Sequence, residues 1–172
     1  IVKNNSNAKI DNLNADYESK IYVVNDSKLE INKNAEFYNG ARLIIEDNSS
    51  AKIDNLTGYN SKIYVVNDSK LEINKNAEIY DGSKIYVAND SKLEINENAD
   101  FYGGTDLSLD NSTLDIKGEA IFDETSVLIN HGSTAKIDNL EDYGSKIYVV
   151  KDSKLEIDKD AIFAGTHLIV KD

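Results

Sequence analysis

The residues that most often carry chemistry are sparse in this chain. It has two histidines, His131 and His167, and no cysteine. The histidines fall in different repeats and at different repeat positions, so they match neither a Ser/His/Asp triad nor a metal-site spacing. The lack of cysteine excludes disulfides and thiolate metal sites. We therefore expect both histidines to be surface turn residues.

Carboxylates are plentiful and could in principle serve sugar cleavage or calcium binding. Polysaccharide lyases and hydrolases need clustered carboxylates, often with calcium and a base, usually on inserted loops. No repeat here carries an insertion, so we expect no enzyme, and a polysaccharide-active one is the least favoured alternative. Acids recur at Asp26, Asp68, Asp90 and Asp152, but the Gly-Gly-x-Gly-x-Asp motif of calcium β-rolls is missing. We expect no cofactor, with weak surface calcium as an alternative, because Asp also suits turns.

A row of tyrosines beside cations has the most potential for binding. The phrase Ser-Lys-Ile-Tyr-Val occurs four times, and strand alternation sends its Lys and Tyr to the same face. A tyrosine ring offers flat apolar area with a hydroxyl, which suits a sugar or a protein. The alternative is that Tyr and Ile occur there because they favour strands. The candidate binding residues are Tyr22, Tyr64, Tyr86, Tyr148, Lys20, Lys62, Lys84 and Lys146.

These residues must be positioned by an internal repeat. The phrases Ser-Lys-Ile-Tyr-Val, Asp-Ser-Lys-Leu-Glu-Ile and Ala-Lys-Ile-Asp-Asn-Leu divide the chain into eight rungs of 20 to 22 residues. Each rung has short alternating apolar segments between Asn, Asp, Gly and Ser clusters, which indicates strands and turns. One inward isoleucine per rung falls on the central strand: Ile10, Ile31, Ile53, Ile73, Ile95, Ile116, Ile137 and Ile157.

The repeat predicts an all-β fold, a single-stranded parallel β-helix (β-solenoid) with about eight rungs and three short strands per rung. We expect right-handed winding, because connections between parallel strands are almost always right-handed. Residues 1–172 form one domain. We expect it to be a segment of a longer array or a stacking subunit, since Ile1-Val2-Lys3 and Ile169-Val170-Lys171 share the same repeat phase.

One outward-facing position of the central strand alternates in charge from rung to rung. It reads Lys9, Glu30, Lys52, Glu72, Glu94, Asp115, Lys136 and Glu156, and opposite charges are neighbours at five of the seven steps. We expect exposed ion pairs along this face. Tyrosines at the rung ends are expected to pack at corners, in two kinds of rung: Tyr17, Tyr59 and Tyr143 in one, and Tyr38, Tyr80 and Tyr102 in the other.

The charge balance limits the possible partners. The net charge is −12 and Arg42 is the only arginine. Nucleic-acid binding is not expected, because phosphate contacts need clustered cations. Membrane insertion is not expected either, because no apolar run is long enough to span a bilayer.

The repeated phrases also carry a family resemblance. Asn-Asp-Ser-Lys-Leu-Glu-Ile-Asn at 67–74 and Asn-Ser-Thr-Leu-Asp-Ile at 111–116 resemble the β-helical passengers of bacterial surface adhesins, such as autotransporters and filamentous haemagglutinins. The resemblance spans the whole chain. It implies export to the cell surface, an extended stalk, and attachment to host surfaces, glycans or other copies. We expect a secreted, non-enzymatic structural or adhesive scaffold or filament subunit. A carbohydrate-binding module that uses the Tyr/Lys face is the alternative.

Overall fold

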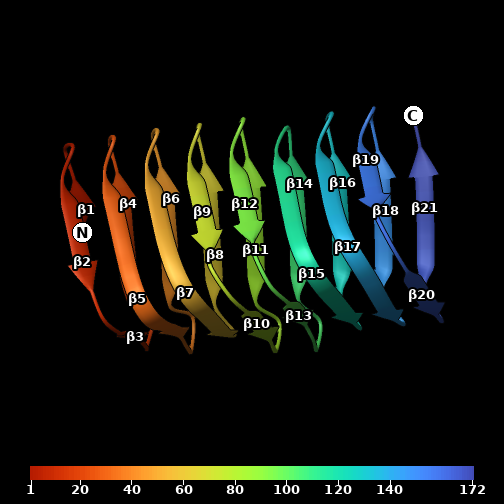
Figure 1. The fold of residues 1–172 in the computed structure, drawn as a ribbon, viewed down its shortest axis with the longest axis horizontal. Coiled ribbons are helices and arrows are strands. Elements are labelled where there is room, and N and C mark those ends of the chain that lie inside the picture. The colour runs from red at the N-terminus through yellow and green to blue at the C-terminus, as the bar shows by residue number, and fades with distance from the viewer.

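The strands of each repeat stack into a parallel β-solenoid without helices. The computed structural model describes all residues 1–172 (Figure 1). Its strands lie in a nine-stranded sheet, sheet A, and a twelve-stranded sheet, sheet B. The predicted fold class is confirmed, with about eight turns and roughly three strands in each.

Sheet A contains the first strand of every turn, and consecutive turns are neighbours in it. Ile21 pairs with Leu43, and Leu43 with Ile63, so one inward apolar residue per turn is aligned in this sheet. The strands are β1 (Val2–Lys3), β4 (Lys20–Val24), β6 (Arg42–Glu46), β8 (Lys62–Val66), β11 (Lys84–Ala88), β14 (Asp106–Asp110), β16 (Ser126–Asn130), β18 (Lys146–Val150) and β21 (His167–Lys171).

Sheet B contains the second and third strands of each turn. They run on as one long strand in β5 (Lys28–Phe37), β7 (Ser50–Tyr59), β15 (Thr113–Asp123) and β17 (Thr134–Tyr143). Elsewhere a short break separates them, as β2 (Asn7–Ile10) from β3 (Leu13–Ala15), β9 (Lys70–Ile73) from β10 (Ala77–Tyr80), β12 (Lys92–Ile95) from β13 (Ala99–Phe101), and β19 (Lys154–Ile157) from β20 (Ala161–Ala164).

The winding can be followed in Figure 1. The sheet B strands in front run downward, and the sheet A strands behind them run upward. The chain meanwhile advances from the N-terminus on the left to the C-terminus on the right. This winding is right-handed, as expected for crossovers between parallel strands.

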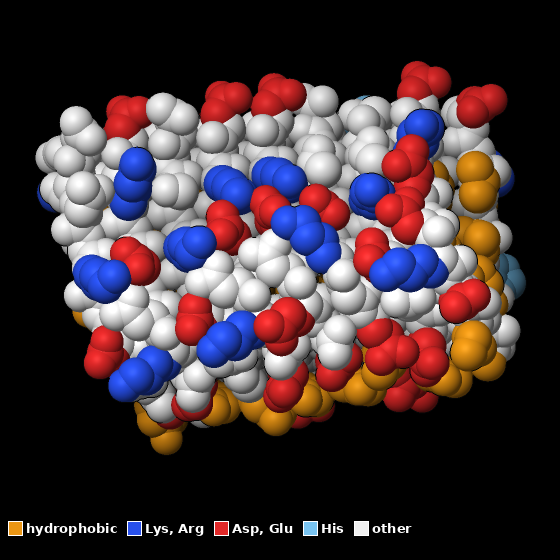
Figure 2. Space-filling model, in the orientation of Figure 1, with side chains coloured by type: hydrophobic (Ala, Val, Ile, Leu, Met, Phe, Trp, Pro, Cys, Tyr) orange, Lys and Arg blue, Asp and Glu red, His pale blue; other side chains and the backbone are white.

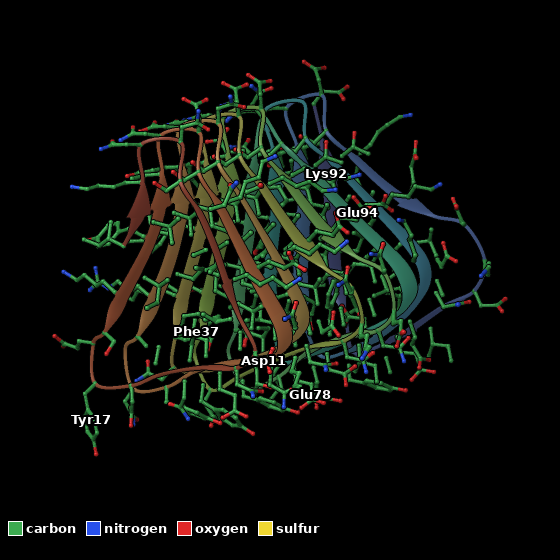
Figure 3. All side chains as sticks on the ribbon, turned by 60° about the vertical axis from the view of Figure 1, so that its left-hand side comes forward. Asp11, Tyr17, Phe37, Glu78, Lys92 and Glu94 are labelled. Carbon is green, nitrogen blue, oxygen red and sulfur yellow. The ribbon has the colours of Figure 1, made fainter.

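The core fills the space between the two sheets. It comprises 37 buried hydrophobic residues in one continuous cluster. The isoleucine column is fully buried from Ile31 to Ile137, whereas Ile10 in the first turn is 37% exposed. Phe37 points into the interior, while Lys92 and Glu94 lie on the outer surface (Figure 3). Burial of one apolar column per strand is what fixes the register, since a slip by one residue would turn every side chain over.

Differences in turn length are absorbed at two places. Where β5 meets β7, and where β15 meets β17, the register shifts in the middle of sheet B, between Ile31 and Asn34 and between Ile116 and Glu119. One strand there carries an extra residue, as in a β-bulge. The other place is the connection that leads into sheet A. The columns on either side stay aligned, so no turn needs a projecting loop.

The turn between sheets A and B is formed by residues in the left-handed backbone region. Asp26 and Asp68 have φ of 60°, and Asp90 and Asp152 have φ of 59°. Asn and Asp tolerate this conformation better than most residues. The recurring turn acids therefore have a conformational role.

A ladder of buried serines lines the same turn. The backbone N–H of Ser27 donates to Ser49 Oγ at 3.1 Å, that of Ser49 to Ser69 Oγ at 3.2 Å, and that of Ser69 to Ser91 Oγ at 3.1 Å. These serines are at most 2% exposed. Each hydroxyl thus supplies the acceptor that the preceding turn's buried N–H needs. The Asp-Ser-Lys phrase marks three of the four positions, but nothing in the apolar period of the sequence predicts this role.

Candidate binding face on sheet A

Sheet A brings the predicted Tyr and Lys residues together in two neighbouring outward columns. Lys20 pairs with Arg42, Arg42 with Lys62, and Lys62 with Lys84. These four residues form a continuous row, which we call the cation row. Beside it lies the tyrosine column: Tyr22, Ile44, Tyr64, Tyr86, Ser108, Leu128 and Tyr148, all partly buried.

The eight predicted residues do not form one uniform site. Tyr64 and Tyr86 are direct neighbours. Ile44 stands between Tyr22 and Tyr64. Tyr148 and Lys146 lie apart from the rest, because two intervening turns carry Asp106 and Ser126 in the cation column. The densest part of the face is therefore on β8 and β11.

The cation row is poorly neutralised. Only Lys84 forms an ion pair within it, with Asp106 at 2.7 Å. That contact raises the pKa of Lys84, through the hydrogen bond to Asp106 and then its charge. Lys20, Arg42 and Lys62 form no ion pair. Arg42 Nε is buried without a hydrogen-bond partner.

A depression adjoins the row where the tyrosine column is interrupted. Ser108 takes the place of a large side chain between Tyr86 and Leu128, which leaves a hollow of about 370 Å³. Burial, and then the charge of Asp110, raises the pKa of Tyr86, so this phenol stays protonated. The hollow is lined by Tyr64, Lys84, Tyr86, Asp106, Ser126 and Leu128, together with the strand beneath them.

On sheet B, by contrast, the second strands pair many of their charges. The third strands carry acids without ion pairs, and burial, followed by the charges of Glu78 and Glu119, raises the pKa of Asp100. Lysines and carboxylates alternate closely over the outer face of the sheet (Figure 2). Lys9 pairs with Glu30 and Lys52 with Glu72, each at 2.7 Å. The expected pairing within this column is correct only at these two steps, because Lys136 pairs instead with Asp158 at 2.9 Å, one column away.

Glu94 is the hub of the sheet B charges. It pairs with Lys70 at 2.9 Å, with Lys92 at 3.2 Å and with Lys117. Its side chain is only 13% exposed. Hydrogen bonding, first from Lys117 and then from Lys70, lowers the pKa of Glu94 to about 2. A shallow groove of about 510 Å³ crosses the earlier turns of this sheet, but its lysine and glutamate walls largely neutralise each other.

The corner tyrosines differ from the prediction. Tyr38, Tyr59, Tyr80 and Tyr102 form one stacked ladder across four turns, with ring centroids 5.6, 4.6 and 5.4 Å apart. The two expected kinds of rung therefore share a single column. Tyr17 lies outside it and projects from the corner, 83% exposed (Figure 3).

The histidines do not converge. His131 occupies a turn with φ of 51° and lies 2.7 Å from Asp110 through Nδ1. His167 instead starts strand β21, so its expected turn position is wrong. No group of three or more acidic, histidine or cysteine side chains is arranged to hold a metal ion. No helix in the structure could cross a membrane.

The fold defines the class of protein, a parallel β-solenoid built from one repeat. Comparison with protein-family models finds no matching family, and comparisons with curated proteins and with solved structures find no match. The resemblance to surface adhesins therefore rests on the repeat phrases alone.

Proposed function

We propose that the chain is a non-enzymatic structural scaffold, a stretch of an extended extracellular stalk or adhesive filament. The observation that carries this proposal is the unbroken strand pairing of sheet A from β1 in the first turn to β21 in the last. Turns of 20 to 22 residues follow one another without an inserted loop. Such a shape provides length and stiffness.

Exposed core residues at the end of the solenoid support stacking of one copy on another. At the C-terminal end, Phe163 is 43% exposed, Leu168 45% and Val170 69%. Hydrophobic atoms gather at this edge of the molecule, on the right of Figure 2. Solenoid ends normally need a cap or a further turn, because bare core and open strand edges attract other chains. A second copy stacked on this end would cover these residues.

A second copy would fit in register. The columns place β19 over β2, so that Leu155 meets Ala8 and Glu156 meets Lys9, repeating the Lys9–Glu30 pairing. Val2 and Val170 share one column, so β21 of one copy would take the place of β1 in the next. β1 is held by only two residue pairs, whereas β18 pairs with β21 at five positions. Replacing β1 of the next copy by the longer β21 would therefore increase the number of paired residues at the joint.

The test is the assembly state of the 172-residue chain. We expect sedimentation and electron microscopy to show end-to-end rods that lengthen with concentration. Leu168→Lys should block assembly, because it places a charge inside the joint, while Ile169→Lys, on the outward side of the same strand, should not. Circular dichroism checks that both variants fold. A chain that stays monomeric at every concentration, or equal assembly of both variants, would contradict stacking of copies.

Carbohydrate binding by sheet A is a second candidate function. The hollow beside Tyr86 favours it, because apolar walls with a few polar groups are typical of ligand sites and its volume lies at the lower end of their range. A glycan array should show binding that is lost in the Tyr64→Ala/Tyr86→Ala variant and kept in Tyr17→Ala. The absence of binding to any glycan would overturn this candidate and leave the scaffold proposal intact.

A further inference from the structure

The charge on sheet A is uneven along the solenoid. Over the turns of β4, β6, β8 and β11, the outer face carries the four cations of the cation row and one carboxylate, Glu46. Further on, Asp106 is paired with Lys84, and Asp110 lies against His131. A chain of net charge −12 thus keeps a local positive strip on this face.

The edges of the sheet restrict what could bind this strip. Carboxylates stand at the turns on both sides, such as Asp26 and Asp68 on one side and Glu18 and Asp81 on the other. A broad negative surface, such as a membrane or a nucleic-acid duplex, would meet these acids as well as the strip. A slender anionic chain that runs parallel to the solenoid axis could lie along the cation row itself and contact the cations directly, away from the turns that carry these acids.

The neighbouring column adds a preference for sugars. Successive turns are about 4.8 Å apart, which is close to the length of one pyranose residue in an extended chain. Each turn from β4 to β11 offers one cation and, beside it, one partly buried Tyr or Ile. Aromatic faces pack well against apolar sugar faces. The hollow at Ser108 continues the same track beyond Tyr86.

We propose that this face binds a linear acidic polysaccharide parallel to the solenoid axis. Its negative groups lie against Lys20, Arg42 and Lys62, and its rings lie against Tyr64 and Tyr86. This inference rests on the second candidate function, carbohydrate binding, and names the ligand class. It does not depend on the scaffold proposal.

The test compares three probes by calorimetry with the 172-residue chain: polygalacturonate, its methyl-esterified neutral form, and polyglutamate. We expect polygalacturonate to bind about tenfold more tightly than either of the others at low salt, and salt to weaken it. The Arg42→Gln/Lys62→Gln variant should lose about tenfold in affinity for polygalacturonate. Lys9→Gln/Lys52→Gln removes the same charge from sheet B and should bind almost like the parent.

Each result decides a different point. Equal binding of the neutral and acidic polymers would overturn the acidic ligand while retaining carbohydrate binding. Equal binding of polyglutamate would show a general polyanion site and overturn the sugar preference. Equal losses in the two variants would show that overall charge, not the cation row, controls binding. No binding of any probe would overturn the proposal.

Discussion

Glu94 shows how a single residue can have a stronger effect than its exposed neighbours. It receives contacts from Lys70, Lys92 and Lys117, on the turn before its own, on its own turn and on the turn after it. Most lysine–carboxylate pairs on this face are more exposed, and such pairs contribute little. Because Glu94 is mostly shielded and has three lysine partners, its charged form is stabilised and its pKa lies well below the ordinary value.

We predict that Glu94→Gln lowers the free energy of unfolding by about 1–2 kcal/mol at pH 7, allowing for solvent screening. The folded pKa of about 2 lies below the unfolded value. The contribution is therefore complete above about pH 4.5 and disappears as the pH falls to about 2. Urea unfolding of parent and variant between pH 2 and 7 measures this. Glu30→Gln, at an exposed pair with Lys9, is the control and should change stability by under about 0.5 kcal/mol.

At the scale of elements, the serine ladder links successive turns where no strand pairing does. Ser69 accepts from the Ser49 N–H at 3.2 Å and donates to the Asn67 carbonyl at 3.3 Å. If its hydroxyl is removed, the Ser49 N–H is left buried without an acceptor, and an unsatisfied buried donor costs more than an ordinary hydrogen bond contributes.

Ser69→Ala should therefore lower the free energy of unfolding by about 1–3 kcal/mol. Ser50→Ala is a matched control, since Ser50 lies on the outer, partly exposed side of β7. We expect that substitution to be nearly neutral. Chemical unfolding of both variants provides the comparison. Equal effects would mean that the ladder contributes no more than a surface serine.

The strands were largely predictable from the sequence, whereas the turns were not. The inward column of the central strand follows from the two-residue period, so Ile31, Ile53 and the binding residues were placed in the correct register. Apolar burial gives no signal for turns, so the serine ladder was missed. The tyrosines of the stacked ladder were predicted as two separate groups. Rungs of unequal length had been aligned by their shared phrases, and this alignment does not show which corner residues pair. The bulges realign Tyr59 with Tyr38 and Tyr80.

Long flexible side chains were the least predictable. Charges that alternate from one turn to the next indicated pairs such as Lys9–Glu30, but a lysine reaches carboxylates in adjacent columns as easily as in its own. Lys117 reaches Glu94 from the bulge after Ile116, a position that period counting cannot supply. The hollow at Ser108 likewise depends on which large side chains surround a small one.

At the scale of the whole molecule, each turn contacts only the turns before and after it. Stability in such a stack is approximately a sum over turns and their interfaces, so it need not be lost everywhere at once. The end turns have a neighbour on one side only, and their apolar residues are exposed, as at Leu168 and Ile10. The middle turns, with Ile63 and Ile95 fully buried, have two neighbours.

Native-state hydrogen exchange should therefore show graded protection, highest in β8, β11 and β12 and lowest in β1 and β20. Ile95→Ala, in the middle of the core, should cost about 2–5 kcal/mol. It should reduce protection most in its own turn and in its pairing neighbours β9 and β15. Strands two or more turns away, such as β2, should keep the exchange rates of the parent. Uniform loss across the chain would instead show that the solenoid unfolds as a single cooperative unit, because coupling between turns then exceeds the stability of any one of them.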